Sequence, residues 1–546
     1  MITARSTVTA LAAAVLAAAG LFAVAIPSAT PASAAAAVED EGANCPAPAL
    51  PDAGALPTNA RLPDPFLRLS GSRITTTGDW TCRRNEIKKL AEKFVYGEKP
   101  PKPQTVSGTV SSSSITVNVS HQGRTSSFSA SVSLPSGTGP FPAVVVLGGF
   151  GADTSTIRSA GAAVINYDPY SVGREGTPRN NKQGAFYSIY GNTSTTGLLA
   201  AWSWGVSRII DVIEQSGGSI LRADIGVSGC SRFGKGAFAV GAFDQRIALT
   251  MPIESGSAGV PIYRGIPGEG AQSLSSAYGE QPWLGDAFGS FTGSPTRLPV
   301  DTHSVVAMIA PRGLFIMDNP HIANLGPRSA SVAALGGAEV YKALGAGANI
   351  TYWSDIQNGS HCAVRPEWTT PLQQHIRKYL LRTGNDPGTI RISSRAAGNL
   401  AEWRDWQTPT LTPTTPSSPA SPSPWDPPPS SPSPSPSSPG PSSPGPSNPP
   451  GGCSATVSLN SWNGGFVATI RITAGSSAIN GWSVGLTLPA GTTITNSWNV
   501  NRSGTTGAVQ LSNVSYNGRL TAGGSTEVGF QATGTGGTMT PSCTAT

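Results

Sequence analysis

Charged residues and histidines are scarce in this 546-residue chain, and clusters of basic residues are missing. Asp, Glu, Lys and Arg make up 12% of the sequence, roughly half the ~25% of an average soluble domain. The 36 basic and 30 acidic residues leave a net charge of +6, and no block of consecutive Lys or Arg residues is longer than two. A nucleic-acid-binding protein usually carries such a basic patch. The sequence therefore predicts that nucleic acid is not a partner.

Long apolar runs are also rare, since only one occurs, near the amino terminus. Arg5 precedes the run from Leu11 to Ile26, which is followed by Pro27 and by Ala32-Ser33-Ala34. This order is typical of a secretory signal with an A-x-A cleavage site, whereas a membrane span needs ~20 apolar residues. We therefore predict that residues 1–36 are a signal peptide, that the mature protein is secreted and extracellular, and that a membrane is not a partner.

Only six cysteines are present, and in an exported protein they are candidates for three disulfides. Six cysteines allow fifteen pairings in principle, so their number and spacing leave the pairing open. The cysteines are Cys45, Cys82, Cys230, Cys362, Cys453 and Cys543.

Glycine and proline, in contrast, are abundant, and proline is concentrated in one stretch. The chain has 65 Gly and 48 Pro, and residues 407–452 consist largely of Pro, Ser, Thr and Gly. Such a composition favours extended, polyproline-like conformations, which at ~3.1 Å per residue would span on the order of 140 Å. We predict that residues 407–452 are a linker between a large unit, residues 45–406, and a small unit, residues 453–546.

The large unit alternates short apolar strands with longer helical stretches, such as Leu198 to Glu214 and Val332 to Leu344. This alternation is typical of a mostly parallel sheet with helices on both faces, in which ligands bind at the carboxyl ends of the strands. A further amphipathic helix, Asn85 to Tyr96, is expected to have a packing role. The strand candidates are Ala143 to Leu147, Ala163 to Tyr167, Ile225 to Ser228, Ile247 to Ile253, Leu314 to Met317 and Ile350 to Trp353.

One window, Ile225 to Gly236, carries the pattern of a serine nucleophile. A short strand runs into a glycine-flanked turn, with the sequence G-C-S-R-F-G from Gly229 to Gly234, and then into a helix. In α/β-hydrolases this arrangement lifts a serine above the sheet, although the second glycine here falls one position later than in the common G-x-S-x-G. Ser231 is therefore the candidate nucleophile, and a serine that only caps the helix is the structural alternative.

A serine nucleophile needs a general base, and the base needs a carboxylate that orients it. Of the five histidines, His361 follows the last predicted strand in a Gly-containing loop, the usual location of the base in such a fold. His303, beside a helical stretch, is expected to contact the substrate or a catalytic residue. Asp318 and Glu254 each end a predicted strand, and both give the order serine, acid, histidine. Topology alone slightly favours Asp318.

Four motifs of the large unit resemble those of the glucuronoyl esterases of carbohydrate esterase family 15. They are G-C-S-R-F-G-K-G-A from Gly229, I-E-S-G-S from Ile253, A-P-R-G-L from Ala310 and S-H-C from Ser360. The first motif is highly specific, and the match covers nearly all of the large unit. The resemblance implies an α/β-hydrolase fold, a three-layer α/β/α sandwich, that uses no cofactor and no metal.

The same resemblance implies a role for each site residue. Ser231 would be the nucleophile, His361 the base and Glu254, rather than Asp318, the acid. Arg232 would stabilise the oxyanion, an electrostatic effect that typically contributes ~3 kcal/mol. The residues that would contact the hydroxyl groups of a glucuronic acid are Lys235, Gln272 and Glu280.

The resemblance further implies that Cys230 pairs with Cys362, which leaves Cys45 to pair with Cys82. A bond between Cys230 and Cys362 would join the loops of the nucleophile and the base, and closing a loop of about 130 residues stabilises a fold by roughly 5 kcal/mol in the chain-entropy model. One position departs from the family, because its sugar-stacking tryptophan is expected where this chain has Asn324. This difference is expected to affect the affinity and fine specificity for the sugar, and not the ester chemistry.

The small unit is nearly uncharged. Its short alternating runs, separated by Gly, Ser and Asn turns, predict a separate all-β sandwich domain whose ends Cys453 and Cys543 would tie together. Its only ionisable side chains are those of Arg471, Arg502, Arg519 and Glu527.

Three landmarks of the small unit resemble a family 2 carbohydrate-binding module: S-W-N-G-G-F from Ser461, G-W from Gly481 and S-Y-N-G from Ser515. The resemblance covers the whole unit. It implies that Trp482 lies in the core and that an exposed aromatic row stacks on the sugar rings of cellulose. This row comprises Trp462, Trp498 and Tyr516.

Together these features predict a secreted serine esterase. It is expected to hydrolyse the ester between 4-O-methyl-D-glucuronic acid of glucuronoxylan and a lignin alcohol, as well as simple methyl glucuronate esters, and to act as a monomer held on cellulose by its small unit. Two alternatives are another carbohydrate esterase, such as an acetylxylan esterase, and a plant-wall-binding protein without activity. The substrate-side residues argue against the first, and the complete set of Ser231, Glu254 and His361 argues against the second.

Overall fold

The computed structural model describes residues 38–42, 45–413, 452–462, 464–498, 500–514 and 517–545. The chain divides into two units, Met1–Pro419 and Ala420–Thr546. The predicted signal peptide and most of the predicted linker lie outside the described residues. Among the residues that are described, no helix has both the length and the apolar character needed to cross a membrane.

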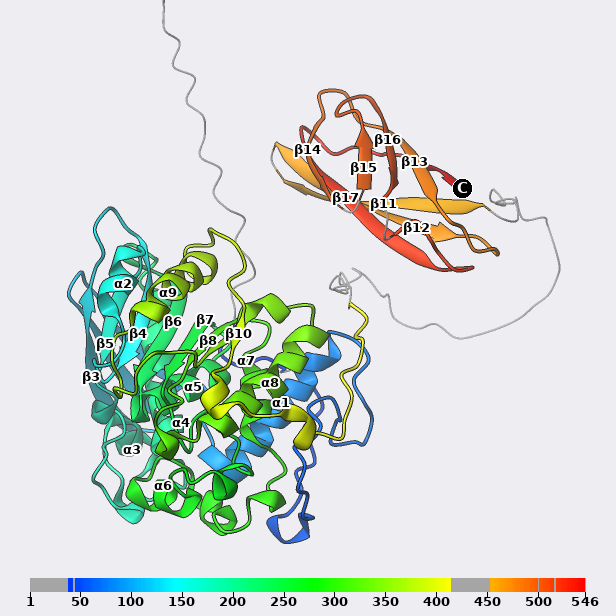
Figure 1. The fold of residues 1–546 in the computed structure, drawn as a ribbon. Helices are drawn as coiled ribbons and strands as arrows, with labels where there is room; N and C mark the ends of the chain where they lie inside the picture. The colour runs from blue at the N-terminus through cyan, green and yellow to red at the C-terminus, as the bar shows by residue number, and fades with distance from the viewer. Residues whose placement is uncertain are drawn as a thin grey trace, which may run out of the picture. The chain divides into compact units, whose positions relative to one another are not determined.

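A ten-stranded sheet forms the centre of the large unit, with the strand order β1-β2-β3-β5-β4-β6-β7-β8-β9-β10. The first three strands pair antiparallel, and the strands from β5 to β10 pair parallel (Figure 1). The strands are β1 (Thr105–Val110), β2 (Ser114–His121), β3 (Arg124–Ser133), β4 (Phe141–Leu147), β5 (Ala163–Tyr167), β6 (Leu221–Cys230), β7 (Ile247–Ile253), β8 (Gly313–Met317), β9 (Ile350–Trp353) and β10 (Ile390–Arg391).

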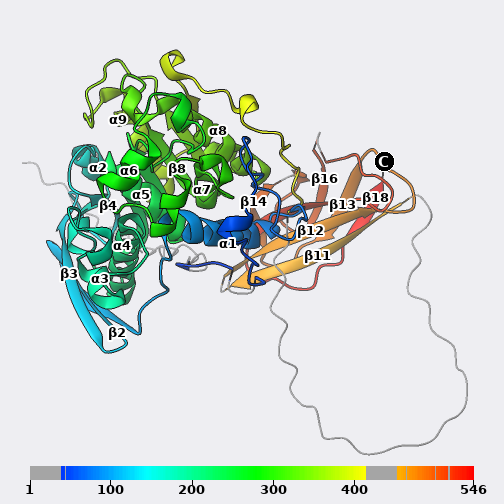
Figure 2. The same ribbon diagram turned by 90° about the horizontal axis from the view of Figure 1, so that it is seen from below.

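Helices cover both faces of this sheet, as Figures 1 and 2 show. On one face α2 and α9 pack together against β5, β7 and β8, and on the other α4 and α5 lie side by side against β6 and β7, with α7, α8 and α1 beyond them. The helices are α1 (Asp79–Ala91), α2 (Thr154–Ser159), α3 (Ala185–Tyr190), α4 (Leu198–Gln215), α5 (Arg232–Phe243), α6 (Leu274–Glu280), α7 (Thr302–Ile309), α8 (Pro327–Ala343) and α9 (Pro366–Tyr379).

The apolar run of β4 explains why this strand lies at the centre. Successive side chains of a strand point to opposite faces, so a strand that is apolar at every position is buried on both. Val144 and Val146 pack in the core under α2 and α9, whereas Val145 and Leu147 pack in the core under α4 and α5. All six predicted strands are present as β4 to β9, and the predicted parallel sheet between helical layers is confirmed.

Two parts of the large unit were predicted only in part. The antiparallel extension β1 to β3 has a Ser- and Thr-rich outer face, and only alternate residues such as Val117 and Phe128 are buried. The helix expected from Asn85 to Tyr96 begins earlier, at Asp79, and its last turn is the π-helix Glu92–Tyr96. Polar strands and helix ends depend on their neighbours, which a local sequence pattern does not contain.

The amino-terminal segment inserts an acidic residue into the large unit. Glu39 forms ion pairs with Lys99 and Arg208, whose side chains are fully buried, and lies 3.6 Å from Arg246. The backbone of Glu39 also accepts a hydrogen bond from the amide of Gln245, at 3.0 Å. Because buried cations are stable only when they are paired, this segment completes the charge balance beside α4.

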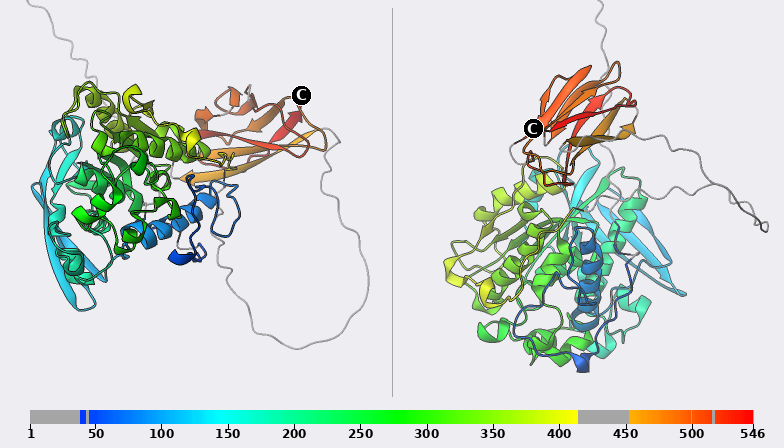
Figure 3. Two further views of the ribbon diagram at one scale, coloured as in Figure 1. Left: turned by 60° about the horizontal axis from the view of Figure 1, so that its bottom comes forward. Right: turned by 90° about the vertical axis from the view of Figure 1, so that its right-hand side faces the viewer.

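The small unit is a sandwich of two four-stranded antiparallel sheets, β11-β12-β17-β14 and β15-β16-β13-β18, which Figure 3 displays from two sides. Trp482 is buried between them, where its indole nitrogen donates to the carbonyl of Asn517 at 2.8 Å, so the prediction of a core residue is confirmed. The strands are β11 (Cys453–Trp462), β12 (Gly465–Ala474), β13 (Trp482–Thr487), β14 (Thr493–Trp498), β15 (Val500–Ser503), β16 (Ala508–Asn513), β17 (Ser525–Thr533) and β18 (Ser542–Ala545).

Candidate active site

Ser231 lies in the sharp turn between β6 and α5, with φ of 59° and ψ of −124°. Residues other than glycine rarely adopt a positive φ, and such strain is found at functional sites. Both flanking glycines are required by close contacts. A Cβ on Gly229 would lie 2.6 Å from the carbonyl oxygen of Phe233, and a Cβ on Gly234 would lie 2.5 Å from that of Ile253. The late second glycine therefore lets α5 approach the end of β7.

Glu254 ends β7 and contacts His361. Its Oε2 lies 2.6 Å from Nδ1 of His361 and accepts the backbone amide of Cys362 at 2.9 Å. Its Oε1 accepts from Asn319 and from the guanidinium of Arg365, both at 3.3 Å. The carboxylate is fully buried, and these donors stabilise its charge. A carboxylate that accepts from Nδ1 leaves Nε2 of His361 unprotonated and able to take a proton.

Asp318, the other candidate acid, is engaged elsewhere. Its Oδ2 accepts from the hydroxyl of Tyr352 at 2.9 Å, and its Oδ1 accepts from the backbone amide of Asn319 at 3.0 Å. Burial raises the pKa of Asp318 to about 7, and the nearby Glu254 adds to the rise against the effect of these two hydrogen bonds. The carboxylate on the ring of His361 is thus Glu254, and the slight topological preference for Asp318 has no support in the geometry.

A cavity of about 310 Å³ brings the other predicted site residues together. Ser231 and Arg232 enter it from the start of α5, and His361 enters it from the loop after β9. Six of the seven residues predicted for catalysis or sugar binding line this cavity; the seventh, Glu254, is buried behind His361. The lining residues are Ser231, Arg232, Lys235, Gly256, Gln272, Glu280, Trp283, Ile322, Asn324, Leu325 and His361.

Arg232 is held by acidic and aromatic neighbours. Its guanidinium lies 2.8 Å from the carboxylate of Glu175 and 3.5 Å from that of Glu280, over the ring of Trp283. Burial alone would lower the pKa of Arg232, but the hydrogen bond and charge of Glu175 outweigh burial and raise it. The side chain therefore remains a cation beside the nucleophile. Glu175 and Trp283 were not predicted as site residues, because no local motif distinguishes them.

Lys235 lies one helical turn after Ser231 and is almost fully buried. Its Nζ donates to the carbonyl of Ser255 at 2.5 Å and lies 5.2 Å from the centre of the Trp283 ring. Burial lowers the pKa of Lys235 to about 7, although Glu280 acts in the opposite direction. This ammonium group thus loses its proton far more readily than a lysine in water.

Gln272 and Glu280 form one polar edge of the cavity. The amide nitrogen of the Gln272 side chain donates to Glu280 at 2.7 Å, and the backbone amide of Gln272 donates to the carbonyl of Asn324 at 3.0 Å. Asn324, where the family tryptophan is expected, is exposed and lines the cavity. The aromatic side chain that lines the cavity is Trp283.

Three disulfides are present: Cys45–Cys82, Cys230–Cys362 and Cys453–Cys543. These are the pairs expected from the resemblance and from the positions of the cysteines. Cys230–Cys362 joins the end of β6 to the His361 loop, as expected. Its sulfur atoms lie close to Glu254 and His361, within the distances of a metal site. Because a disulfide carries no thiolate and His361 already contacts Glu254, this set does not fit a metal ion.

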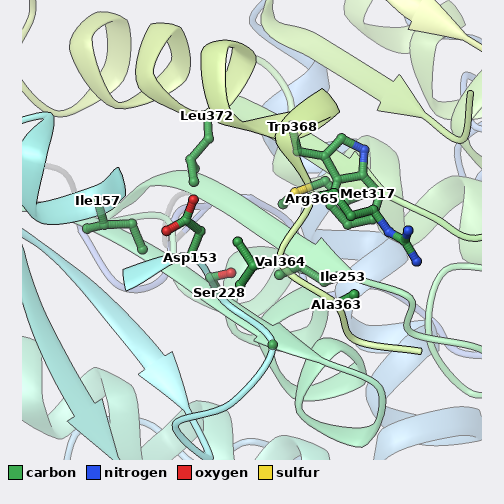
Figure 4. Close-up of a pocket in the computed structure, with 11 residues that line it drawn as sticks. Asp153, Ile157, Ser228, Ile253, Met317, Ala363, Val364, Arg365, Trp368 and Leu372 are labelled. Carbon is green, nitrogen blue, oxygen red and sulfur yellow. The ribbon is translucent and has the colours of Figure 1, made fainter. Parts of the chain in front are cut away.

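A second, smaller cavity of about 20 Å³ lies on the α9 side of the sheet (Figure 4). It is lined mostly by apolar side chains such as Ile253 and Trp368, with Ser228, Asp153 and Arg365 among them. Its volume is sufficient for about one water molecule and is too small for a sugar. We interpret it as a packing gap beside Arg365, which contacts Glu254.

The prediction for His303 is wrong. This residue lies in α7, is fully buried, and has its Nε2 2.8 Å from the carbonyl oxygen of Pro63. Burial lowers its pKa to about 4. It does not line the large cavity. The predicted helical context is confirmed, since His303 lies in α7, but the face on which the ring lies depends on tertiary packing.

The structure does not describe the side chains of the predicted row of cellulose-binding aromatic residues. Trp462 ends β11 and Trp498 ends β14, and their side chains are outside the described residues. Tyr516 lies wholly outside the described residues. The row therefore remains a prediction.

Comparison with known proteins agrees, for each of the two units, with the family resemblance found in its sequence motifs. Residues 117–345 match the family described as glucuronyl esterase of fungi, and residues 453–546 match the cellulose binding domain family. The chain is 37% identical over 377 residues to the 4-O-methyl-glucuronoyl methylesterase of Hypocrea jecorina, a match that covers 68% of this chain and 80% of that protein. The chain belongs to the glucuronoyl esterase family.

Solved glucuronoyl esterases have the same fold. The catalytic domain from Hypocrea jecorina aligns with a TM-score of 0.62 at 35% identity, covering 66% of this chain and 100% of that domain. A serine-to-alanine mutant of the Sporotrichum thermophile glucuronoyl esterase, in complex with methyl 4-O-methyl-β-D-glucopyranuronate, aligns with a TM-score of 0.61 at 35% identity, over 65% of this chain and 97% of that one. The predicted α/β-hydrolase fold and the resemblance to glucuronoyl esterases are thus confirmed.

Proposed function

We propose that this glucuronoyl esterase hydrolyses uronate esters through a Ser231-His361-Glu254 triad. The observation that carries the proposal is one cavity lined both by Ser231 and His361 and by polar side chains suited to a sugar. The contact of 2.6 Å between His361 and Glu254 supports the assignment of base and acid. Such a triad is recognised by the geometry and role of its members rather than by their order in the chain.

In the proposed mechanism, Nε2 of His361 takes the proton of Ser231 as its oxygen attacks the uronoyl carbonyl carbon. The oxyanion that forms is stabilised by the Arg232 cation and by backbone amides. His361 then gives the proton to the leaving alcohol, and the ester bond breaks. His361 then takes a proton from a water molecule as the water attacks the acyl-enzyme carbonyl carbon. It returns this proton to the oxygen of Ser231 as the acyl bond breaks, which releases the uronic acid and regenerates Ser231.

The acid part of the substrate is proposed to be 4-O-methyl-D-glucuronic acid. The Lys235 amine, the Gln272 amide and the Glu280 carboxylate offer donors and acceptors in the same cavity, which suits vicinal hydroxyl groups. The Sporotrichum thermophile relative supports this assignment, because its complex contains the methyl ester of that sugar. Asn324 in place of an aromatic residue is expected to weaken sugar binding without changing the ester chemistry.

The natural ester is proposed to join glucuronoxylan to a lignin alcohol. The match of residues 453–546 to the cellulose binding domain family supports a role for the small unit in holding the enzyme on cellulose. Tethering raises the local concentration of esterase near its polymer without altering the reaction. We also propose that the protein is secreted after removal of residues 1–36 and that it acts as a monomer.

The test compares hydrolysis of a methyl glucuronate ester with hydrolysis of an acetyl ester by the wild-type chain and by Ser231→Ala. We expect turnover of the glucuronate ester, weak turnover of the acetyl ester, and loss of both in the variant. Preference for the acetyl ester would refute the proposed substrate and favour an acetylxylan esterase. Full activity of Ser231→Ala would refute the proposed nucleophile.

A further inference from the structure

One buried carboxylate beside the cavity accepts hydrogen bonds from three side chains. Oε2 of Glu175 accepts from the guanidinium of Arg232 at 2.8 Å and from the hydroxyl of Tyr170 at 2.7 Å. Oε1 of Glu175 accepts from the indole nitrogen of Trp283. The Glu175 side chain is 7% exposed, and it lies in the loop that follows β5, outside every motif of the sequence.

The two acceptor oxygens of a carboxylate satisfy all three contacts. The three partners are all donors, and a glutamine would have one acceptor oxygen and would direct its amide hydrogens toward at least one of them. Leaving a buried donor without a partner is costly, so the three side chains are oriented by the charge and shape of this one group. Glu175 therefore links Arg232, from the start of α5, with the buried indole of Trp283.

Arg232 has a second acidic partner, Glu280, whose contact is longer and more exposed to solvent. Glu280 lies 3.5 Å from the guanidinium, is 38% exposed, and also accepts from Gln272. In the proposed function a sugar hydroxyl competes for this same carboxylate. When the substrate is bound, the contact that continues to hold Arg232 is the one with Glu175.

We propose that Glu175 is a positioning residue that holds the guanidinium of Arg232 where the oxyanion forms. The inference rests on the proposed function, because it assumes that Arg232 stabilises the transition state. The Arg232 side chain is 38% exposed, so without Glu175 it would sample several rotamers in solvent. Preorganised charge is effective because no reorganisation is needed during the reaction.

Two effects of Glu175 oppose each other, and the experiment distinguishes them. Its negative charge partly neutralises Arg232, so a neutral residue could strengthen the field at the oxyanion. Its hydrogen bond fixes the guanidinium, so the same change would also misplace the cation. We expect the second effect to dominate, since misplacement by about 1 Å can lower a rate by about 100-fold.

The test is a double-mutant cycle on a soluble methyl glucuronate ester with full-length wild type, Glu175→Gln, Arg232→Ala and the double variant. We expect Glu175→Gln to lower kcat by about 10- to 100-fold with KM within about threefold, because the lost contact acts in the transition state. In the Arg232→Ala background the same change is expected to alter kcat by less than about threefold. Should Glu175→Gln fail to fold, Glu175→Asp, which keeps the charge and shortens the reach, takes its place in the cycle.

A matched control is Glu269→Gln. Glu269 also accepts three hydrogen bonds, from the backbone amides of Arg328 and Ser329 and the hydroxyl of Ser329, but it does not line the cavity. This variant should retain the wild-type kcat. The inference is overturned if Glu175→Gln lowers kcat equally in the wild-type and Arg232→Ala backgrounds. It is also overturned if Glu175→Gln raises kcat in the wild-type background. An Arg232→Ala variant with wild-type kcat refutes instead the proposed role of Arg232.

Discussion

The two units of this chain handle charge in opposite ways. In the esterase unit, carboxylates with little solvent exposure are paired: Glu254 with His361 and Arg365, Glu175 with Arg232, and Glu39 with two buried cations. In the small unit the ionisable side chains are few, and Arg519 is exposed. Ester hydrolysis develops negative charge in a site with little water, where fixed charges act strongly. Stacking on a neutral polysaccharide has no such requirement.

The largest expected effect comes from neutralising Glu254. Glu254→Gln would place an amide against Nδ1 of His361 and favour the wrong tautomer, so we expect kcat to fall about ten-thousand-fold. Asp318→Asn, whose carboxyl does not contact His361, should change kcat by less than about tenfold. Kinetics on a methyl glucuronate ester measure both, with cellulose binding as the unchanged control. If Glu254→Gln kept its activity and Asp318→Asn lost it, Asp318 rather than Glu254 would be the acid of the triad.

A second effect concerns stability rather than catalysis. Glu39→Gln would leave the buried Lys99 without its carboxylate and Arg208 with Asp211 alone, so we expect the free energy of unfolding of the esterase unit to fall by about 3 kcal/mol. Asp40→Asn, which removes a more exposed ion pair with Lys88, should cost less than about 1 kcal/mol. Urea unfolding followed by loss of esterase activity gives both values. Equal stabilities of the two variants would show that the buried charges are balanced without Glu39.

The Glu39 contribution should also depend on pH. Burial acts to raise the pKa of Glu39, but the charges of Lys99 and Arg208 outweigh burial and lower it below the usual 4.5. The unfolded chain therefore binds this proton more readily than the folded one. The stabilisation should be present above pH 4.5 and decline as the pH falls through the lowered pKa. Wild type and Glu39→Gln should accordingly approach each other in stability below pH 4.5, and a constant difference would contradict this linkage.

A smaller effect is expected when the module loses one aromatic residue. Trp462→Ala or Trp498→Ala should weaken binding to cellulose by about tenfold each, as truncation of a contacting tryptophan commonly does. Turnover of a soluble methyl glucuronate ester should remain that of the wild type. Depletion of protein from solution by cellulose measures the affinity. Unchanged binding in both variants would remove these residues from the proposed row.

The smallest effect should follow neutralisation of a charge in the module. Arg519→Gln is an exposed substitution, so we expect it to change stability by less than about 0.5 kcal/mol. Cellulose affinity should stay within about twofold of the wild-type value and should vary little with salt. A strong salt dependence of cellulose binding would contradict the contrast between the two units.

Much of the esterase unit could be predicted because its signals are local. The strands β4 to β9 are short apolar runs, and the glycines around Ser231 mark a turn of special geometry, so both are visible in a few consecutive residues. The position of His361 in the Gly-containing loop after the last predicted strand also made it the candidate base. The Ser- and Thr-rich strands β1 to β3 lack such a signal, and their burial on one face depends on packing against α3 and α4.

The sequence by itself determined the two-unit organisation, the parallel sheet, and the identity of Ser231 and His361 as candidates, because each rests on composition, periodicity or a motif. For the acid, topology slightly favoured Asp318 and the family resemblance implied Glu254, and the tertiary structure shows Glu254 on the ring of His361. Only the tertiary structure decided which residue holds Arg232. Glu254 and Asp318 end adjacent strands, and their roles differ only in the direction of their side chains. Glu175 lies 56 positions before Ser231, and two of its three donors, Arg232 and Trp283, come from distant segments. Contacts between such segments are set by the packing of the whole domain, which no local pattern records.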